Sequence, residues 1–168
     1  MILLGDVIRV VACAMEVLSS DGQKAVNYAA EGGGWSPYAE NDRAAALAVW
    51  EQVVQLESGA HLALMWRVLK DNHHFGEATL DDLTCHVAYH VKGGDRFGRE
   101  GLKYWVRHWA RRDGSSREAA RLYGRSYDAH QRFYREQVAP CLDSWMVVAK
   151  GALEPVILQH YENFLEAA

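Results

Sequence analysis

Apolar residues recur every three or four positions along most of this chain, and this spacing constrains the fold more than any other feature. Around residues 102–109, Leu102, Trp105, Val106 and Trp109 fall on one side of a helix, while basic residues fall on the other. Side chains at i, i+3, i+4 and i+7 share one helical face, so the pattern predicts amphipathic helices. We therefore predict an all-α fold, a helical bundle, with both tryptophans in its core.

Several local signals predict where helices begin and end. The EGGGWSP segment at 31–37 predicts a loop, and Ser19–Gly22 predicts a shorter interruption. Thr79 and Asp82 have the spacing of a capping box and predict a helix start. The alternating apolar residues at 87–91 would also fit a strand, but the start signal and the lack of a partner strand favour a helix.

Composition limits the class of protein. With 168 residues and 49% hydrophobic residues, the chain can bury a core as one domain or as a domain with a helical extension. The three cysteines, Cys13, Cys85 and Cys141, are odd in number and widely spaced, which indicates a reducing compartment without a disulfide framework. Charges interrupt the apolar N-terminal stretch, and no run reaches the roughly 18 apolar residues of a membrane span. We expect a soluble, cytoplasmic protein with no membrane partner.

The distribution of charge is strongly uneven. The segment from Lys92 to Glu136 holds 12 basic and 6 acidic residues, a net charge of +6. The rest of the chain holds 6 basic and 16 acidic residues, a net charge of −10, which gives −4 overall. A basic segment inside an acidic protein is typical of a phosphate-binding surface. The alternative is a solvated basic helix that pairs with the acidic remainder.

Within this basic segment, residues 113–138 predict two short helices joined by a tight turn. Ser115 and Glu118 form a capping box at the start of the first helix. Gly124 can adopt the positive φ that a tight turn needs, and Ser126 can cap a second helix through about residue 138. The alternative to a nucleic-acid-binding unit is an ordinary helical hairpin in the bundle.

Polar side chains on and around the two helices form the candidate DNA-binding site. We expect Gln131 and Arg132 to reach base edges, and Arg111, Arg117 and Arg125 to contact phosphates. The complete set of candidate DNA-binding residues is Arg111, Arg117, Arg125, Ser126, Tyr127, Gln131, Arg132 and Arg135.

The stretch 113–138 resembles the helix-turn-helix of sigma-factor region 4 and of phage late-gene antitermination factors. It shares with them a capped first helix with a small residue, a turn glycine and a recognition helix led by serine. The resemblance covers about 26 of the 168 residues. It implies a DNA-binding transcription regulator that acts on double-stranded DNA near promoters, with RNA polymerase as a partner.

The expected organisation has three parts: an acidic helical region over 1–92, the basic helix-turn-helix region over 93–140, and a C-terminal helix over 141–168. We expect this last helix to be bent or broken near Gly151 and Pro155. Its simplest role is to close the bundle, and the alternative is a partner-binding or homodimer helix.

Two other classes of function remain alternatives. A small inhibitor or immunity-type protein would use the acidic surface to occupy a target. A helical metalloenzyme would use His86 and His90, which lie four apart and share a helical face. This pair matches no known metal signature, and no nucleophile or phosphate-binding loop is apparent. We therefore expect no metal, no cofactor and no enzymatic activity.

Overall fold

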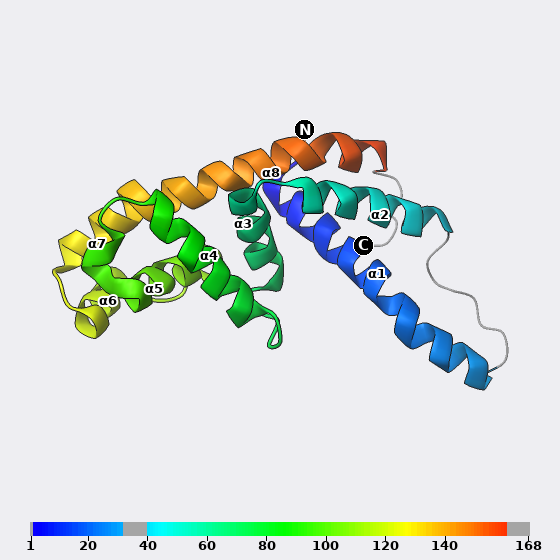
Figure 1. The fold of residues 1–168 in the computed structure, drawn as a ribbon, viewed down its shortest axis with the longest axis horizontal. Helices are drawn as coiled ribbons and strands as arrows, with labels where there is room; N and C mark the ends of the chain where they lie inside the picture. The colour runs from blue at the N-terminus through cyan, green and yellow to red at the C-terminus, as the bar shows by residue number, and fades with distance from the viewer. Residues whose placement is uncertain (1, 32–39, 161–168) are drawn as a thin grey trace. The chain divides into compact units, whose positions relative to one another are not determined.

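A computed structural model describes residues 2–31 and 40–160, and these contain helices and no β-strand (Figure 1). The prediction of an all-α fold is confirmed. Apart from Glu31, the loop expected at 31–37 lies outside the described residues. No helix in the described part of the chain is long and apolar enough to cross a membrane.

The chain divides into two compact units. One comprises residues 1–56 together with 149–168, and the other comprises residues 57–148. The boundaries expected from the sequence, after residues 92 and 140, differ from these. The reason is that helices preceding residue 92 pack with the basic helices that follow it.

The first unit is built on α1 (Leu4–Glu31) and α2 (Glu40–Gln55), which pack together. Its buried residues are mostly small or β-branched: Ile2, Val7, Val10, Val11, Ala14, Val17, Ala45, Ala46, Val49 and Val53, with Ala149, Leu153 and Ile157 from the last helix, α8 (Ala139–Gln159). The interruption expected at Ser19–Gly22 is wrong, because α1 runs through it. Serine, aspartate and glycine are poor helix formers, but each costs only about 0.5–1 kcal/mol relative to alanine.

The second unit carries the basic segment. In chain order it contains α3 (Ser58–Leu69), α4 (Gly76–His90), the 3₁₀ turn η1 (Gly94–Phe97), α5 (Gly98–Arg111), α6 (Ser116–Tyr123), α7 (Tyr127–Phe133), the π-helical segment η2 (Tyr134–Val138) and the start of α8 (Ala139–Gln159). The central helix is α5, which contacts α4, α6, η1 and η2. Its four apolar residues Leu102, Trp105, Val106 and Trp109 are all at most 2% exposed, which confirms that both tryptophans are core residues.

The helix over 76–90 confirms the choice of helix over strand, but its predicted start is wrong. α4 begins at Gly76, and Thr79 lies inside its first turn, where its hydroxyl donates to the Phe75 carbonyl (2.9 Å). Asn72 Oδ1 instead accepts the backbone N–H groups of His74 and Phe75 just before the helix. Thr79 is therefore not a helix cap, although its spacing from Asp82 fits one, because its hydroxyl donates to a backbone carbonyl of the preceding turn.

The second predicted helix of the 113–138 segment does not end near residue 138. Helical backbone continues from α7 through η2 into α8, and Tyr134 and Ala139 both have right-handed helical dihedrals. Pro140 has no N–H to donate one turn back, and the Ala139 N–H bonds to the Tyr134 carbonyl five residues earlier. The π-helical turn thus accommodates the proline without ending the helix. Of the bend or break expected near Gly151 and Pro155, the break is wrong, since α8 runs through both residues.

Candidate nucleic-acid interface

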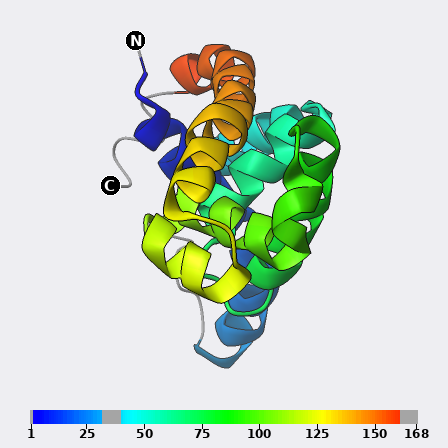
Figure 2. The same cartoon turned by 90° about the vertical axis from the view of Figure 1, so that its left-hand side faces the viewer.

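The α6–α7 turn has the local structure expected from its sequence. Ser115 Oγ accepts the Glu118 N–H, and Ser126 Oγ accepts the Ala129 N–H, each at 3.2 Å, so both serine caps are confirmed. Gly124 has φ 74° and ψ −167°, a region open essentially to glycine alone. Arg125 follows with φ 66°, so two consecutive positive φ angles turn the chain. Figure 2 turns α6 and the start of α7 (yellow-green to yellow) toward the viewer.

A buried histidine fixes this turn to the core. The His130 side chain is 0% exposed, its Nε2 lies 2.7 Å from the Gly124 carbonyl, and its Nδ1 accepts the Trp105 indole N–H at 3.1 Å. A carbonyl can only accept, so the proton sits on Nε2 and the ring is the neutral tautomer. Sequence reasoning missed this role, because the hydrogen bonds that link His130 to Trp105 and to Gly124 depend on how the helices pack.

The start of α6 is attached to α5 through Tyr104. The Ser115 N–H donates to the Tyr104 hydroxyl (2.6 Å), and that hydroxyl lies 3.0 Å from both the Ser115 carbonyl and a Glu118 carboxylate oxygen. Burial, with Glu118 nearby, raises the pKa of Tyr104 to about 12, so the hydroxyl keeps its proton and can donate. Together Tyr104 and His130 hold α6, the turn and α7 in a fixed relation to α5.

The cations of α5 are largely neutralised by acidic residues of the same unit. Lys103 contacts Asp81 (2.8 Å) and Glu77 (3.2 Å), and Arg107 contacts Glu77 (3.3 Å). The hydrogen bond from Lys103 lowers the pKa of Asp81, and Asp81 raises the pKa of Lys103 in return. Arg99 lies 3.8 Å from Asp81. For this helix, the alternative interpretation of the basic segment is the correct one: its charges pair with acidic residues outside the segment.

The remaining cations of the segment behave differently. None of them forms an ion pair with any residue that the structure describes. These cations are Lys92, Arg96, Arg112, Arg117, Arg121, Arg125, Arg132 and Arg135. Apart from Lys92, Arg96 and Arg112, they lie on α6, the turn, α7 or η2. The uncompensated positive charge of the second unit is therefore concentrated around the two short helices.

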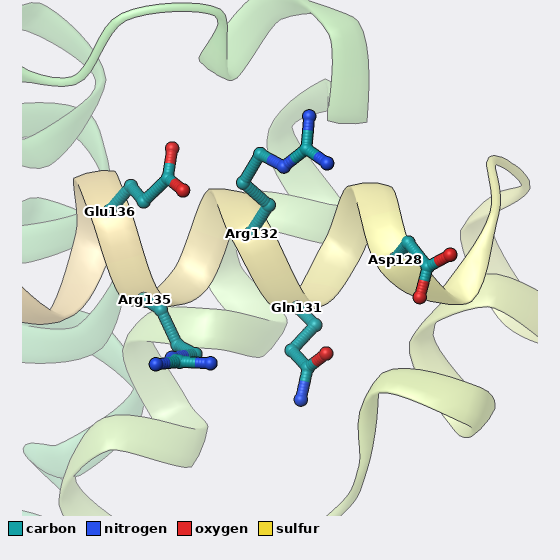
Figure 3. Close-up of a pocket in the computed structure, with 5 residues that line it drawn as sticks. All are labelled: Asp128, Gln131, Arg132, Arg135 and Glu136. Carbon is teal, nitrogen blue, oxygen red and sulfur yellow. The ribbon is translucent and has the colours of Figure 1, made fainter.

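The outer face of α7 and η2 carries a shallow hollow of about 320 Å³ lined only by polar side chains. Its residues are Asp128, Gln131, Arg132, Arg135 and Glu136. Figure 3 shows that they form two rows: Arg132 and Glu136 point to one side of the helix, and Gln131 and Arg135 point to the other. We call this surface the α7 face. It offers guanidinium and amide donors together with carboxylate acceptors.

The structure separates the candidate DNA-binding residues into two groups. Arg117, Arg125, Tyr127, Arg132 and Arg135 are exposed, and Gln131 lies on the α7 face. Ser126 already uses its hydroxyl oxygen as the α7 cap.

Arg111 lies apart from the other arginines. Its guanidinium donates from two nitrogens to the Lys70 carbonyl, lies 3.9 Å from Asp71, and sits 5.6 Å from the Trp66 ring centre. It therefore attaches the end of α5 to the loop after α3.

A second hollow, which we call the η1 cleft, is basic; it lies between η1 and the α7–η2 helix and has a volume of about 330 Å³. Four cations line it: Lys92, Arg96, Arg125 and Arg132. Sequence reasoning did not select Lys92 or Arg96, because they lie about 20 residues before the helix-turn-helix pattern. Their inclusion in the basic segment was the only available signal.

The two histidines considered as metal ligands form an aromatic cluster. The rings of His86 and His90 lie 4.9 Å apart, and each lies about 5 Å from the Trp145 ring, at 5.1 and 5.2 Å. Gly59 packs against the same indole, where a β-carbon would come within 2.4 Å of Trp145 Cε2. Among the described residues, no group of three or more His, Cys, Asp or Glu side chains is placed to hold a metal ion.

Comparison with protein-family models, with curated proteins and with solved structures finds no match to this chain.

Proposed function

We propose that this protein binds double-stranded DNA through the α7 face and regulates transcription. One observation carries the proposal. The basic segment divides into α5 cations that are neutralised within the protein and α6–α7 cations that have no ion pair among the described residues. DNA-binding affinity comes mainly from cations that are free to displace counterions from phosphates, so this second group is the one available for DNA.

The geometry of the α7 face fits the width of a base-reading surface. Asp128 and Arg135 are seven residues apart along the helix, which corresponds to about 10 Å at 1.5 Å per residue, or about three base-pair steps. Arginine donates well to guanine, glutamine pairs with adenine, and a carboxylate accepts from the cytosine amino group. Gln131, Arg135 and Asp128 thus supply side chains that can discriminate bases.

The α6–turn–α7 arrangement is the second support. In helix-turn-helix proteins the second helix enters the major groove and the first helix crosses the backbone. Here α6 carries Arg117 and Arg121 beside α7, and the turn carries Arg125. The resemblance to sigma-factor region 4 and to late-gene antitermination factors extends the proposal to DNA sites near promoters, with RNA polymerase as the partner. A homodimer is the alternative assembly for the C-terminal helix.

The test begins by selecting a preferred duplex from a random pool and measuring binding by fluorescence anisotropy over a salt series. Replacing Gln131 or Arg135 by alanine should relax sequence preference by about 1–3 kcal/mol at one base pair. Replacing Arg117 or Arg125 should weaken binding to all sequences and reduce the salt slope by about one unit. Arg111→Ala should also destabilise the protein, because its guanidinium bonds to Lys70.

Arg99 provides the matched control. It belongs to the same basic segment but faces Asp81, so Arg99→Ala should leave the DNA affinity nearly unchanged. A wild-type protein that enriches no duplex, or an Arg99 variant as impaired as the Arg117 variant, would contradict the proposal. The first outcome would favour the inhibitor-type alternative, in which this surface contacts a protein.

A further inference from the structure

We infer that the η1 cleft binds a backbone phosphate of the DNA strand that flanks the groove occupied by α7. This inference rests on the proposed function and adds two residues, Lys92 and Arg96, to the interface. The charge of the cleft is its first support. Four cations from three separate parts of the chain converge on it, and Glu136 is the one carboxylate among the described residues that line it, which gives these residues a net charge of +3.

The cleft cations are not paired with carboxylates in the part of the chain that the structure describes. Neither Lys92, Arg96, Arg125 nor Arg132 forms an ion pair within residues 2–31 and 40–160, whereas four α5 cations do. Bringing like charges together without a counterion is unfavourable, and an external anion relieves this repulsion. Three of the four are arginines, whose planar donor pairs match the oxygens of a phosphate.

The walls of the cleft are attached to each other by an aromatic stack. The Phe97 and Phe133 rings lie 4.2 Å apart and nearly parallel, at 16°. Phe97 also meets the buried His130 ring edge-on at 4.8 Å, and the Lys92 N–H donates to Gln137 Oε1 at 3.1 Å. η1 is therefore fixed against α7 and η2 before any ligand binds, which reduces the entropy lost on binding.

The position of the cleft identifies the phosphate as one from DNA. Arg132 and Glu136 line both the η1 cleft and the α7 face, so the two hollows adjoin along one row of side chains (Figure 3). A helix in the major groove lies between two phosphate backbones. Gln131 and Arg135 lie on the other side of α7. We therefore expect the side of α7 that carries Arg132 to contact one of these two backbones, and Lys92 and Arg96 to contact the same backbone.

The experiment uses the full chain, the selected duplex and the double variant Lys92→Ala/Arg96→Ala. Both residues are exposed, so the variant should fold as the wild type does, which circular dichroism will check. We expect affinity to fall for every sequence, the salt slope to decrease by about one unit (about 0.9 per phosphate contact), and the preferred sequence to stay the same. Arg99→Ala is the control and should keep the wild-type slope.

A second arm locates the phosphate and tests its source. In a series of duplexes, one phosphate at a time is replaced by a neutral methylphosphonate. At one position this replacement should weaken binding of the wild type but leave binding of the double variant unchanged. Inorganic phosphate, added at millimolar concentration as a competitor, should not displace the labelled duplex as unlabelled DNA does. If wild type binds the selected duplex and the double variant keeps the same slope, the inference is overturned while the proposed function stands. If wild type binds no duplex, both are overturned.

Discussion

Gly124 offers the sharpest test of the turn that positions α7. Its φ of 74° and ψ of −167° lie where a residue with a β-carbon is strained by about 1–3 kcal/mol. A β-carbon at this position would meet no atom within 4 Å, so the penalty is purely conformational and includes no steric clash. Alanine also lowers the entropy of the unfolded chain, which returns about 0.4–1 kcal/mol. We therefore expect Gly124→Ala to lower the free energy of unfolding by about 0.5–2 kcal/mol.

Two other glycines provide matched controls. Gly98 has nearly the same backbone conformation, φ 68° and ψ 169°, and also has open space around it, so Gly98→Ala should cost a similar amount. Gly151 also has open space but lies within α8, where alanine should stabilise the helix by about 1 kcal/mol. The same chemical change should thus act in opposite directions according to φ alone.

Urea unfolding followed by tryptophan fluorescence measures all three variants. The midpoints of the Gly124 and Gly98 variants should fall, and that of the Gly151 variant should rise. A Gly124 variant that is as stable as wild type, while the Gly98 variant loses stability, would show that the turn does not adopt this conformation. Circular dichroism before unfolding will establish that each variant starts from a helical state.

Three further predictions follow from contacts in the second unit. His130→Ala should leave the buried Trp105 N–H and the Gly124 carbonyl without partners and should cost about 2–4 kcal/mol in thermal unfolding; an unchanged midpoint would contradict this. Gly59→Ala should destabilise by about 1–3 kcal/mol, because its β-carbon would overlap the Trp145 indole, and unfolding in urea will check this. Burial, followed by the nearby His90, lowers the pKa of His86 below its ordinary value of 6.5. As the pH falls, His86 therefore takes up a proton at a higher pH in the unfolded chain than in the folded protein. The stability that neutral His86 contributes should be fully present above pH 6.5 and should be lost below it, so the free energy of unfolding should decline less steeply with falling pH in His86→Gln. Equal slopes for the two proteins would refute this.

Much of the local structure of this protein is determined by the sequence. The apolar spacing around Trp105 and Trp109 predicted a helix with both indoles in the core, and both are buried. Ser115 and Ser126 predicted two helix starts, and both cap as expected. These predictions succeed because a helical face and an N-cap depend on residues only three or four positions apart.

The local patterns failed where the chain could satisfy them in another way. Thr79 has the spacing of a cap but bonds back to Phe75 within the helix. The second predicted helix did not end near residue 138, because a π-helical turn accommodates Pro140, and Pro155 did not break α8. In each case the sequence signal is a preference of a few kcal/mol or less, and the rest of the helix outweighs it.

Only the tertiary structure decided which charges and which polar groups are available for function. The sequence shows how many cations the basic segment contains. It does not show that Asp81 and Glu77, which lie outside this segment, form ion pairs with Lys103 and its neighbours, so that these cations are less available to bind a ligand. In the same way, Lys92 and Arg96 join Arg132 in one cleft across more than 30 residues. Electrostatic interaction depends on distance in space and on burial, and neither can be read from the order of residues along a chain.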